Sequence, residues 1–377
     1  MIDYEFLRLV WWGLVGVLLI GFAITDGFDL GVGALLTLVG KSDKDRRVMI
    51  NTIGPHWDGN QVWFITAGGA IFAAWPLIYA AAFSGFYIAL ALTLIALWMR
   101  PIGFDYRSKL PNKIWRTAWD WALFCGGLVP ALIFGVAFGN LLLGVPFEFD
   151  NTLRPTYTGS FFGLLNPFAI LAGLVSVAML LTHGANWLQL KTEGNVLARA
   201  RIVSFYLSLV TVLLFMLAGV VVANIDGYVI TSNVDPIATS NPLTKTVEAV
   251  SGAWLNNYST HSWMLVAPVL GIFAGLGSAL FSKQQRGGWA FLMSSLMMAG
   301  IILTAGAAMF PFLMPSSSMP NASLTVWDAT SSYLTLKTMF IVACIFVPIV
   351  LSYTAYSFYV MRGRIKAQDL DKPHTIY

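Results

Sequence analysis

Two aspartates lie within the first hydrophobic run of this sequence, residues 9–38, where charged side chains are costly. Asp26 and Asp29 are three residues apart, so they share one face of a helix. Like charges at that spacing favour a protonated state for one carboxyl near neutral pH, and such a pair can take up and release protons. The alternative is that both lie at the edge of a long tilted helix, hydrated or capping it. We interpret them as a protonatable pair.

A second polar group opens the next hydrophobic run, residues 53–75. The apolar part of this run is too short to cross a bilayer, which takes about 20 residues, so Asp58 and His56 are expected at membrane depth. On a helix, His56, Asn60 and Trp63 form one stripe. Asp58 lies on nearly the opposite side. Proton-relay groups would produce these two polar faces, and so would hydrogen bonds between packed helices. We interpret Asp58 as a relay group and leave His56 open between a relay and a satisfied helix-end histidine.

Haem ligation requires a histidine, methionine, cysteine or tyrosine directed at the iron. His56 and His183 are the histidines near hydrophobic runs. His183 is expected to end the fifth run at the cytoplasmic interface, where a histidine complements the helix dipole. The sequence therefore does not favour a haem site built from this chain alone, and it assigns no metal ligand.

Arg100 has two possible roles, and the two cysteines have one expected role. Arg100 follows the third hydrophobic run, where it either extends its charge to the interface or pairs with an acid of another helix or subunit. Cys125 and Cys344 lie in apolar runs far apart and are expected to be buried structural thiols. The sequence contains no catalytic-triad motif, phosphate-binding glycine loop or paired-cysteine metal motif.

The composition places these groups in a membrane. The sequence is 57% hydrophobic and 11% charged, with a mean hydropathy of +0.72. This leaves too little polar surface for a water-soluble globule, so we expect an all-α polytopic membrane protein with one membrane domain over residues 1–377. The net charge of +4 is attributed to loop topology and not to nucleic-acid binding.

The hydrophobic runs predict nine transmembrane helices, although a hydropathy scan depressed by Asp58 would report eight. Most of the 22 basic residues fall in alternate loops of the nine-span arrangement, which places the N-terminus outside and the C-terminal tail in the cytoplasm. Two four-helix bundles plus one peripheral helix are expected, with residues 224–262 as an external loop. The runs are residues 9–38, 53–75, 78–99, 119–143, 161–183, 203–223, 263–281, 289–312 and 334–359.

Several long strings carry a resemblance to a known family. They include DGFDLGVG at residues 26–33, PHWDGNQVW at residues 55–63 and RPIGFDYRSK at residues 100–109, with FPFLMPSS and SLTVWDATSSYLTL further on. Over nearly its whole length the chain resembles subunit II of the bacterial cytochrome bd quinol oxidases, and within them the enterobacterial-type ubiquinol enzymes.

The resemblance implies a function that the residues alone do not show. The family's complex lies in the bacterial cytoplasmic membrane, oxidises ubiquinol, reduces dioxygen to water and takes protons from the cytoplasm, generating proton motive force. Its two b-type haems and one d-type haem belong to subunit I. Subunit II supports assembly of that haem-bearing partner, in several members holds a structural quinone, and is joined by small single-span accessory subunits. Whether this chain holds a quinone stays open.

The resemblance also assigns roles to individual positions. Asp29 and Asp58 match a proton pathway, to which our interpretation adds Asp26 and His56. Trp57 and Arg100 match positions linked to function or assembly, and Trp63 matches the entrance of an oxygen channel. Two alternatives remain open: a proton-coupled secondary transporter that uses the three aspartates, and a scaffold in which every buried acid is dispensable.

Overall fold

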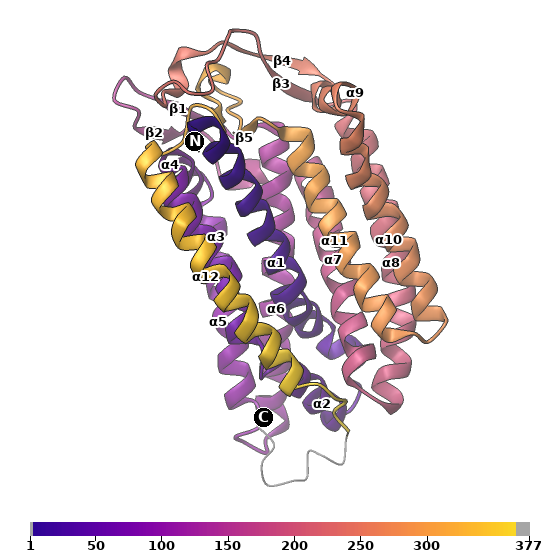
Figure 1. The fold of residues 1–377 in the computed structure, drawn as a ribbon. Helices are drawn as coiled ribbons and strands as arrows, with labels where there is room; N and C mark the ends of the chain where they lie inside the picture. Colours follow the sequence, from indigo (N-terminus) through magenta and orange to yellow (C-terminus); the bar gives the residue numbers. More distant parts are fainter. Residues whose placement is uncertain (1–2, 367–377) are drawn as a thin grey trace.

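The computed structural model describes residues 3–366 as a bundle of long, roughly parallel helices with small β-sheets at one end (Figure 1). The C-terminal tail beyond residue 366 lies outside the described residues. The long helices are α1 Tyr4–Val39, α3 Trp57–Ala74, α5 Tyr87–Tyr106, α6 Lys113–Leu143, α7 Pro167–Lys191, α8 Gly194–Val222, α10 Val266–Lys283, α11 Gly287–Met309 and α12 Tyr333–Val360. The short helices are α2 Asp43–Ile53, α4 Pro76–Gly85 and α9 Asn256–Thr260.

Three two-stranded antiparallel sheets lie at the end of the bundle that holds the N-terminus (Figure 1). They pair β1 Phe147–Phe149 with β2 Pro155–Tyr157, β3 Asp226–Ile230 with β4 Val247–Ser251, and β5 Phe312–Met314 with β6 Leu324–Thr325. The loop between α8 and α10, which carries β3 and β4, is tied to α1 by Arg8. The buried guanidinium of Arg8 donates to the carbonyl oxygens of Pro236 and Ala238 and to the hydroxyl of Thr330.

Eight helices within residues 3–366 are long and apolar enough to cross a membrane. They do not include α3, which has 18 residues but begins with a polar turn that lowers its hydropathy. The expected single run over residues 78–99 is wrong. The chain bends at Phe86 between α4 and α5, and α5 continues to Tyr106. Arg100 therefore lies inside a helix and not at its end.

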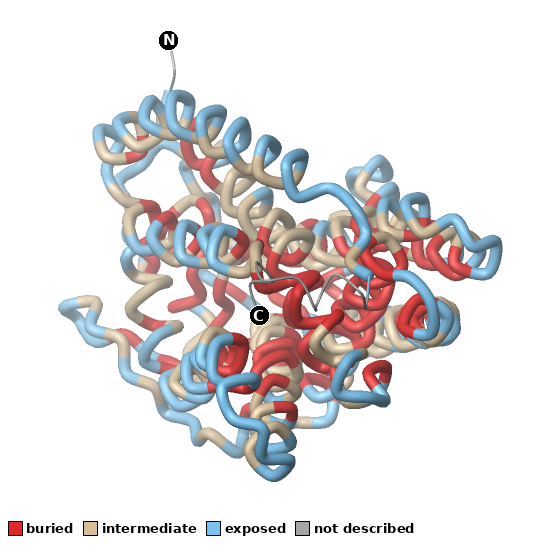
Figure 2. Tube along the Cα trace, turned by 90° about the horizontal axis from the view of Figure 1, so that it is seen from below, coloured by how far each residue is buried: buried red, intermediate tan, exposed pale blue. Residues whose placement is uncertain are grey.

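The expectation that Cys125 and Cys344 are buried is wrong, because both are exposed on the outer faces of α6 and α12. An apolar run in a membrane helix has one face toward the chain's interior and another toward lipid or a partner, and hydropathy does not distinguish the two. Figure 2 shows buried residues concentrated in the middle of the assembly and exposed residues around its edge.

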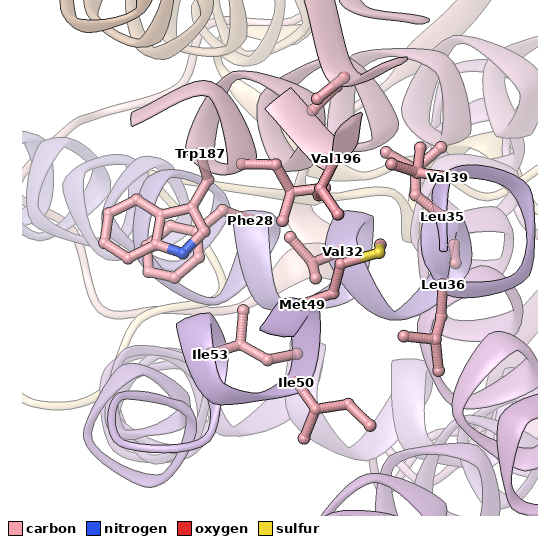
Figure 3. Packing of buried hydrophobic residues seen from close by; sticks show 14 of the residues in the cluster. Phe28, Val32, Leu35, Leu36, Val39, Met49, Ile50, Ile53, Trp187 and Val196 are labelled. Atoms are coloured by element: carbon pink, nitrogen blue, oxygen red, sulfur yellow. The ribbon is translucent and has the colours of Figure 1, made fainter. Parts of the chain in front are cut away.

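At the end opposite the sheets, α2 folds back against α1 and α7. Met49, Ile50 and Ile53 of α2 belong to the same buried apolar cluster as Val32 and Leu36 of α1 (Figure 3). The polar side of α2 carries ion pairs to α5, α6 and α8, so three of the basic loops meet at one end of the molecule. The pairs of α2 are Asp43–Arg107 (2.9 Å), Asp43–Arg116 (3.0 Å), Asp45–Arg199 (2.7 Å) and Arg46–Asp120 (2.6 Å). Asp120 also pairs with Arg107 at 2.6 Å.

Asp45 makes part of the stability of this end depend on pH. Burial would raise the pKa of the Asp45 carboxyl, but hydrogen bonds from the Arg199 guanidinium and the Ser42 backbone nitrogen, with the charge of Arg199, lower it below its ordinary value. A carboxyl with a lowered pKa in the folded state stabilises the fold above its unfolded pKa and loses this contribution as the pH falls through the folded value. We therefore expect wild type to exceed Asp45→Asn in unfolding temperature near neutral pH, with the gap closing below about pH 4.

The measurement is thermal unfolding of the two purified proteins in detergent between pH 7 and pH 3. In an Arg199→Gln background the same substitution should have a much smaller effect, because the principal charged partner of Asp45 is gone. A gap between wild type and Asp45→Asn that stays constant down to pH 3 would contradict this assignment.

Candidate functional site

The centre of the candidate site is an ion pair between α1 and α5. Arg100 donates from both terminal nitrogens to Asp26, at 2.9 Å to Oδ1 and 3.1 Å to Oδ2, and neither residue is exposed. This two-bond geometry matches the planar guanidinium to the carboxylate and is the strong form of such a pair. Of the two interpretations of Arg100, the structure therefore supports pairing with an acid of another helix of this chain.

Asp29 lies one turn further along α1 and is also fully buried. Its Oδ2 accepts a hydrogen bond of 2.8 Å from Asn60 of α3, whereas its Oδ1 is buried without a hydrogen-bond partner. Both aspartates lie well inside the helix, so the alternative of hydrated carboxyls at a helix edge is wrong. The site contains two carboxyls and one guanidinium, and a net negative charge buried at this depth is costly. Within residues 3–366, Arg100 pairs with Asp26, and no ion pair of Asp29 is present.

The polar residues at the start of α3 lie on two sides of the helix, as the helical spacing predicts. His56, at the start of α3, is buried and stacks on Phe358 of α12 with ring centroids 4.6 Å apart. Asn60 reaches Asp29, and the ring of Trp63 packs against Gly21 of α1, where an added Cβ would lie 2.6 Å from the ring.

Asp58 is exposed on the other side of α3, so the structure does not bring it together with Asp29. Trp57 is half-buried, with its ring centroid 6.2 Å from that of Phe104. The polar side chain that α3 directs at the α1 acids is thus Asn60, whose role the sequence left unassigned. The available signal was the spacing, which places the Asn60 amide four residues after His56 on the same face of the helix.

The structure corrects the interpretation of His183. Helix α7 continues to Lys191, so His183 is a fully buried interior residue and not a helix end. Its Nε2 donates to the carbonyl oxygen of Ile24 at 2.9 Å, and its Nδ1 lies 2.7 Å from the hydroxyl of Ser294. Both ring nitrogens are therefore engaged in hydrogen bonds within this chain.

A second polar cluster, which the sequence did not reveal, joins α7, α8, α10 and α11. Asn186 of α7 is its hub and hydrogen-bonds to each of the other three helices. The available signal was a stripe of small hydroxyl residues at helical spacing on α8 and α10. Such a cluster is typical of hydrogen bonding between membrane helices. The partners of Asn186 are Ser204, Ser278, Ser282, Gln189 and the carbonyl oxygen of Ala290.

Comparison with known proteins decides which family this arrangement represents. The model of a family described as cytochrome bd terminal oxidase subunit II matches residues 7–361. The chain belongs to that family. The "Probable cytochrome oxidase subunit 2" of Haemophilus influenzae is 58% identical and the "Cytochrome bd-I ubiquinol oxidase subunit 2" of Escherichia coli K12 is 57% identical, each over 100% of both chains.

More distant relatives of this subunit II extend the match. The "Cytochrome bd ubiquinol oxidase subunit 2" of Bacillus subtilis is 32% identical over 96% of this chain and 97% of its own length. A chain of the bd oxidase structure from Geobacillus thermodenitrificans superposes with a TM-score of 0.67, covering 94% of this chain and 98% of that one. At 16% identity this last likeness shows the fold alone.

The family resemblance inferred from the sequence is thereby confirmed. This subunit II is a multi-pass membrane protein and part of a cytochrome bd terminal oxidase, an oxidoreductase complex that contains haems and a subunit I. Within residues 3–366, no group of three or more His, Cys, Asp and Glu side chains is placed to hold a metal ion.

Proposed function

We propose that this chain is the proton-handling, non-haem subunit of a cytochrome bd complex that oxidises ubiquinol and reduces dioxygen to water. The observation that carries this proposal is the buried site of Asp26, Asp29 and Arg100, in which one carboxyl is neutralised by the guanidinium and the other has a free oxygen. With Asp26 and Arg100 paired, the site is neutral when Asp29 holds a proton and carries one net negative charge when Asp29 releases it. Protons drawn from the cytoplasm for this chemistry would generate proton motive force.

The haems, b-type and d-type, would belong to subunit I and supply the oxygen-reducing chemistry when bound there. The residues of this chain would hold and transfer protons and support assembly of the haem-bearing partner. Asp29 is the storage group, Asp26 and Arg100 set its electrostatic environment, and Asn60 orients it. Asp58, exposed in the first turn of α3, is the group through which water or a partner exchanges protons with the chain, and His56 lies at the same turn.

We infer nine spans with the N-terminus outside. Helix α3, the second span in chain order, adds to the eight helices within residues 3–366 that are long and apolar enough to cross. The α2 end of the bundle carries the ion pairs to basic loops, whereas α4 contacts β2 and β5 at the sheet end. The chain that joins these two ends is α3, which supports a ninth crossing by this helix. Its polar first turn then lies at the cytoplasmic end, where protons are taken up.

The exposed apolar faces of α12 and α5 support docking of subunit I. Of the 28 residues of α12, all of them described, Leu336 is the one that is buried. A helix this exposed and this apolar requires lipid or a partner helix around it. Small single-span accessory subunits would join the same assembly, and membrane lipids would cover the remaining surface.

Two further roles from the resemblance remain proposals. Trp63, packed on Gly21, would line the entrance of an oxygen channel. A groove of about 390 Å³ between α3 and α4 is lined by Phe64, Ile65, Gly68, Gly69, Phe72, Tyr79 and Phe83. It suits an apolar tail, and the Tyr79 hydroxyl is its one side-chain polar group. This is where a structural ubiquinone would find room in this chain.

The proton role is tested with Asp29→Asn and Asp58→Asn in the purified complex. Each variant should slow oxygen consumption per haem by about tenfold, since loss of a positioned proton carrier typically costs that much or more. The control is Asp105→Asn, which changes an exposed acid of α5 near the same end. Turnover and haem content equal to wild type in both variants would refute the proton role and leave the scaffold alternative.

The comparisons do not favour the proton-coupled transporter, because the curated relatives that match the whole chain are oxidase subunits. A visible spectrum of the tagged, purified complex separates the two functions. Haem absorption bands that copurify with this chain are expected for the oxidase, and a transporter would show none.

A further inference from the structure

Helix α12 is held mainly at its two ends. Near its start, the indole nitrogen of Trp11 donates to the carbonyl oxygen of Leu336 at 3.0 Å. Near its other end, Phe358 packs into the buried cluster around α1 and α7, and the ammonium of Lys191 donates to the carbonyl oxygen of Met361 at 2.7 Å. Between these anchors most side chains are exposed, and Met339, Phe340 and Ala343 pack against the apolar cluster that contains Trp11. A displacement of α12 therefore reaches the rest of the chain through the contacts near its two ends, and the packing of Phe358 is one of them.

The Phe358 ring lies against the turn that leads into α3. It stacks on His56 with a centroid distance of 4.6 Å and an interplanar angle of 9°. The rings of Trp187 and His56 are nearly perpendicular, with centroids 5.7 Å apart. The Trp187 indole nitrogen donates to the carbonyl oxygen of Thr52 at 3.1 Å. The turn between α2 and α3 is thus clamped by Trp187 from α7 and by Phe358 from α12.

This turn determines where Asn60 lies. The backbone nitrogen of Asn60 donates to the carbonyl oxygen of His56 at 3.0 Å, so the two residues form the first turn of α3. The Asn60 side chain donates to Asp29 at 2.8 Å. A rotation or shift of His56 moves the start of α3 and changes that hydrogen bond. The contacts form one continuous series from α12 to the buried acids, through Phe358, His56, Asn60 and Asp29.

We propose that Phe358 is a positioning residue that couples the exposed helix α12, through its stack on His56, to the Asn60–Asp29 hydrogen bond. The inference rests on the proposed proton role of Asp29, and it adds a means by which docking of the haem-bearing subunit against α12 adjusts the proton site. The partner surface and the buried acids are then linked by packing and not by a shared ligand.

The test compares Phe358→Ala, Phe358→Tyr and Phe281→Ala in the purified complex. Phe281 is a matched control. It too is partly buried and lies two residues before the end of its helix, and it stacks on Trp289 with ring centroids 5.9 Å apart. Phe358 differs in that it contacts Phe28 and Trp187 edge-on in addition to its stack on His56. The first readout is oxygen consumption per haem. The second is backbone hydrogen exchange of residues 52–62 measured by mass spectrometry.

Phe358→Ala should slow turnover per haem by about threefold to tenfold, as expected for the loss of one aromatic stack, and should speed exchange in residues 52–62. Phe358→Tyr, which keeps the aromatic ring, should match wild type in turnover and in exchange. Phe281→Ala should change neither readout. A fall in haem content with unchanged turnover per haem and unchanged exchange would show a merely structural role and overturn the proposal.

Asp29→Asn, measured in parallel, separates the proton role of Asp29 from the coupling through Phe358. If Asp29→Asn slows turnover while Phe358→Ala behaves as Phe281→Ala does, the coupling is wrong and the proton role stands. If Asp29→Asn leaves turnover unchanged, the proton role fails, and faster exchange in Phe358→Ala then supports only the clamping of the turn and overturns its coupling to turnover.

Discussion

Arg100→Gln should leave little folded, haem-loaded complex. Arg100 and Asp26 are both fully buried, and glutamine has no charge to balance the carboxylate that remains. Removing one partner of a buried ion pair typically costs about 3–5 kcal/mol, because the other charge stays desolvated and unpaired. Asp29, one turn away, is a second acid and supplies no compensating positive charge. The measurements are the unfolding temperature of the purified complex in detergent and its haem content.

A surface arginine of the same chain provides the control. Arg116 pairs with Asp43 at 3.0 Å, but the two side chains are 31% and 43% exposed. Arg116→Gln should therefore cost less than about 1 kcal/mol. Adding Asp26→Asn to Arg100→Gln removes the stranded carboxylate and should recover part of the loss. If Arg100→Gln is no worse than Arg116→Gln, the buried pair does not stabilise the complex.

Gly31→Ala should be the second severe change, although it adds one methyl group. A Cβ at Gly31 would lie 2.1 Å from the carbonyl oxygen of Leu180 and 3.0 Å from the Cα of Gly184, so α1 and α7 meet here backbone to backbone. Backbone atoms cannot rotate away as a side chain does, and the helices must separate. We expect a loss of about 3 kcal/mol, the upper end of ordinary overpacking, measured as unfolding temperature and haem content.

Gly16→Ala tests whether the contact, and not the residue type, is responsible. Gly16 lies on the same helix, and an added Cβ there would meet no atom within 4 Å. This substitution should change stability by no more than about 1 kcal/mol, the difference in helix propensity between the two residues. Equal unfolding temperatures for the two variants would mean that α1 and α7 do not depend on this close approach.

The candidate site shows where sequence reasoning stops. The spacing of Asp26 and Asp29 was enough to place both on one helix face, and their depth in an apolar run was enough to make them functional candidates. The partner of Asp26 was not predictable, because Arg100 is 74 positions away and reaches it only when α1 and α5 pack together. The partner of Asn60 was not predictable for the same reason, because its amide reaches Asp29 only when α3 packs against α1.

Each error has a physical cause. Cys125 and Cys344 were expected inside and are exposed, and His183 was expected at a helix end and is an interior residue. For the cysteines, hydropathy measures the affinity of a segment for an apolar medium, and lipid, a partner helix and the protein interior are all apolar. Only packing decides which of the three a side chain meets. For His183, the end of the apolar run does not mark the end of the helix, because α7 continues to Lys191 through residues buried against other helices.

The sequence by itself determined that this is an α-helical membrane protein of the cytochrome bd subunit II family, with acids buried in its first span. Composition, run length and long specific strings are local properties of the chain, so they survive without a structure. The tertiary structure decided that Asp26 is paired, that Asn60 and not Asp58 contacts Asp29, and that Phe358 lies on His56. These are contacts between segments distant in sequence, and they exist only after helices choose their neighbours and rotations.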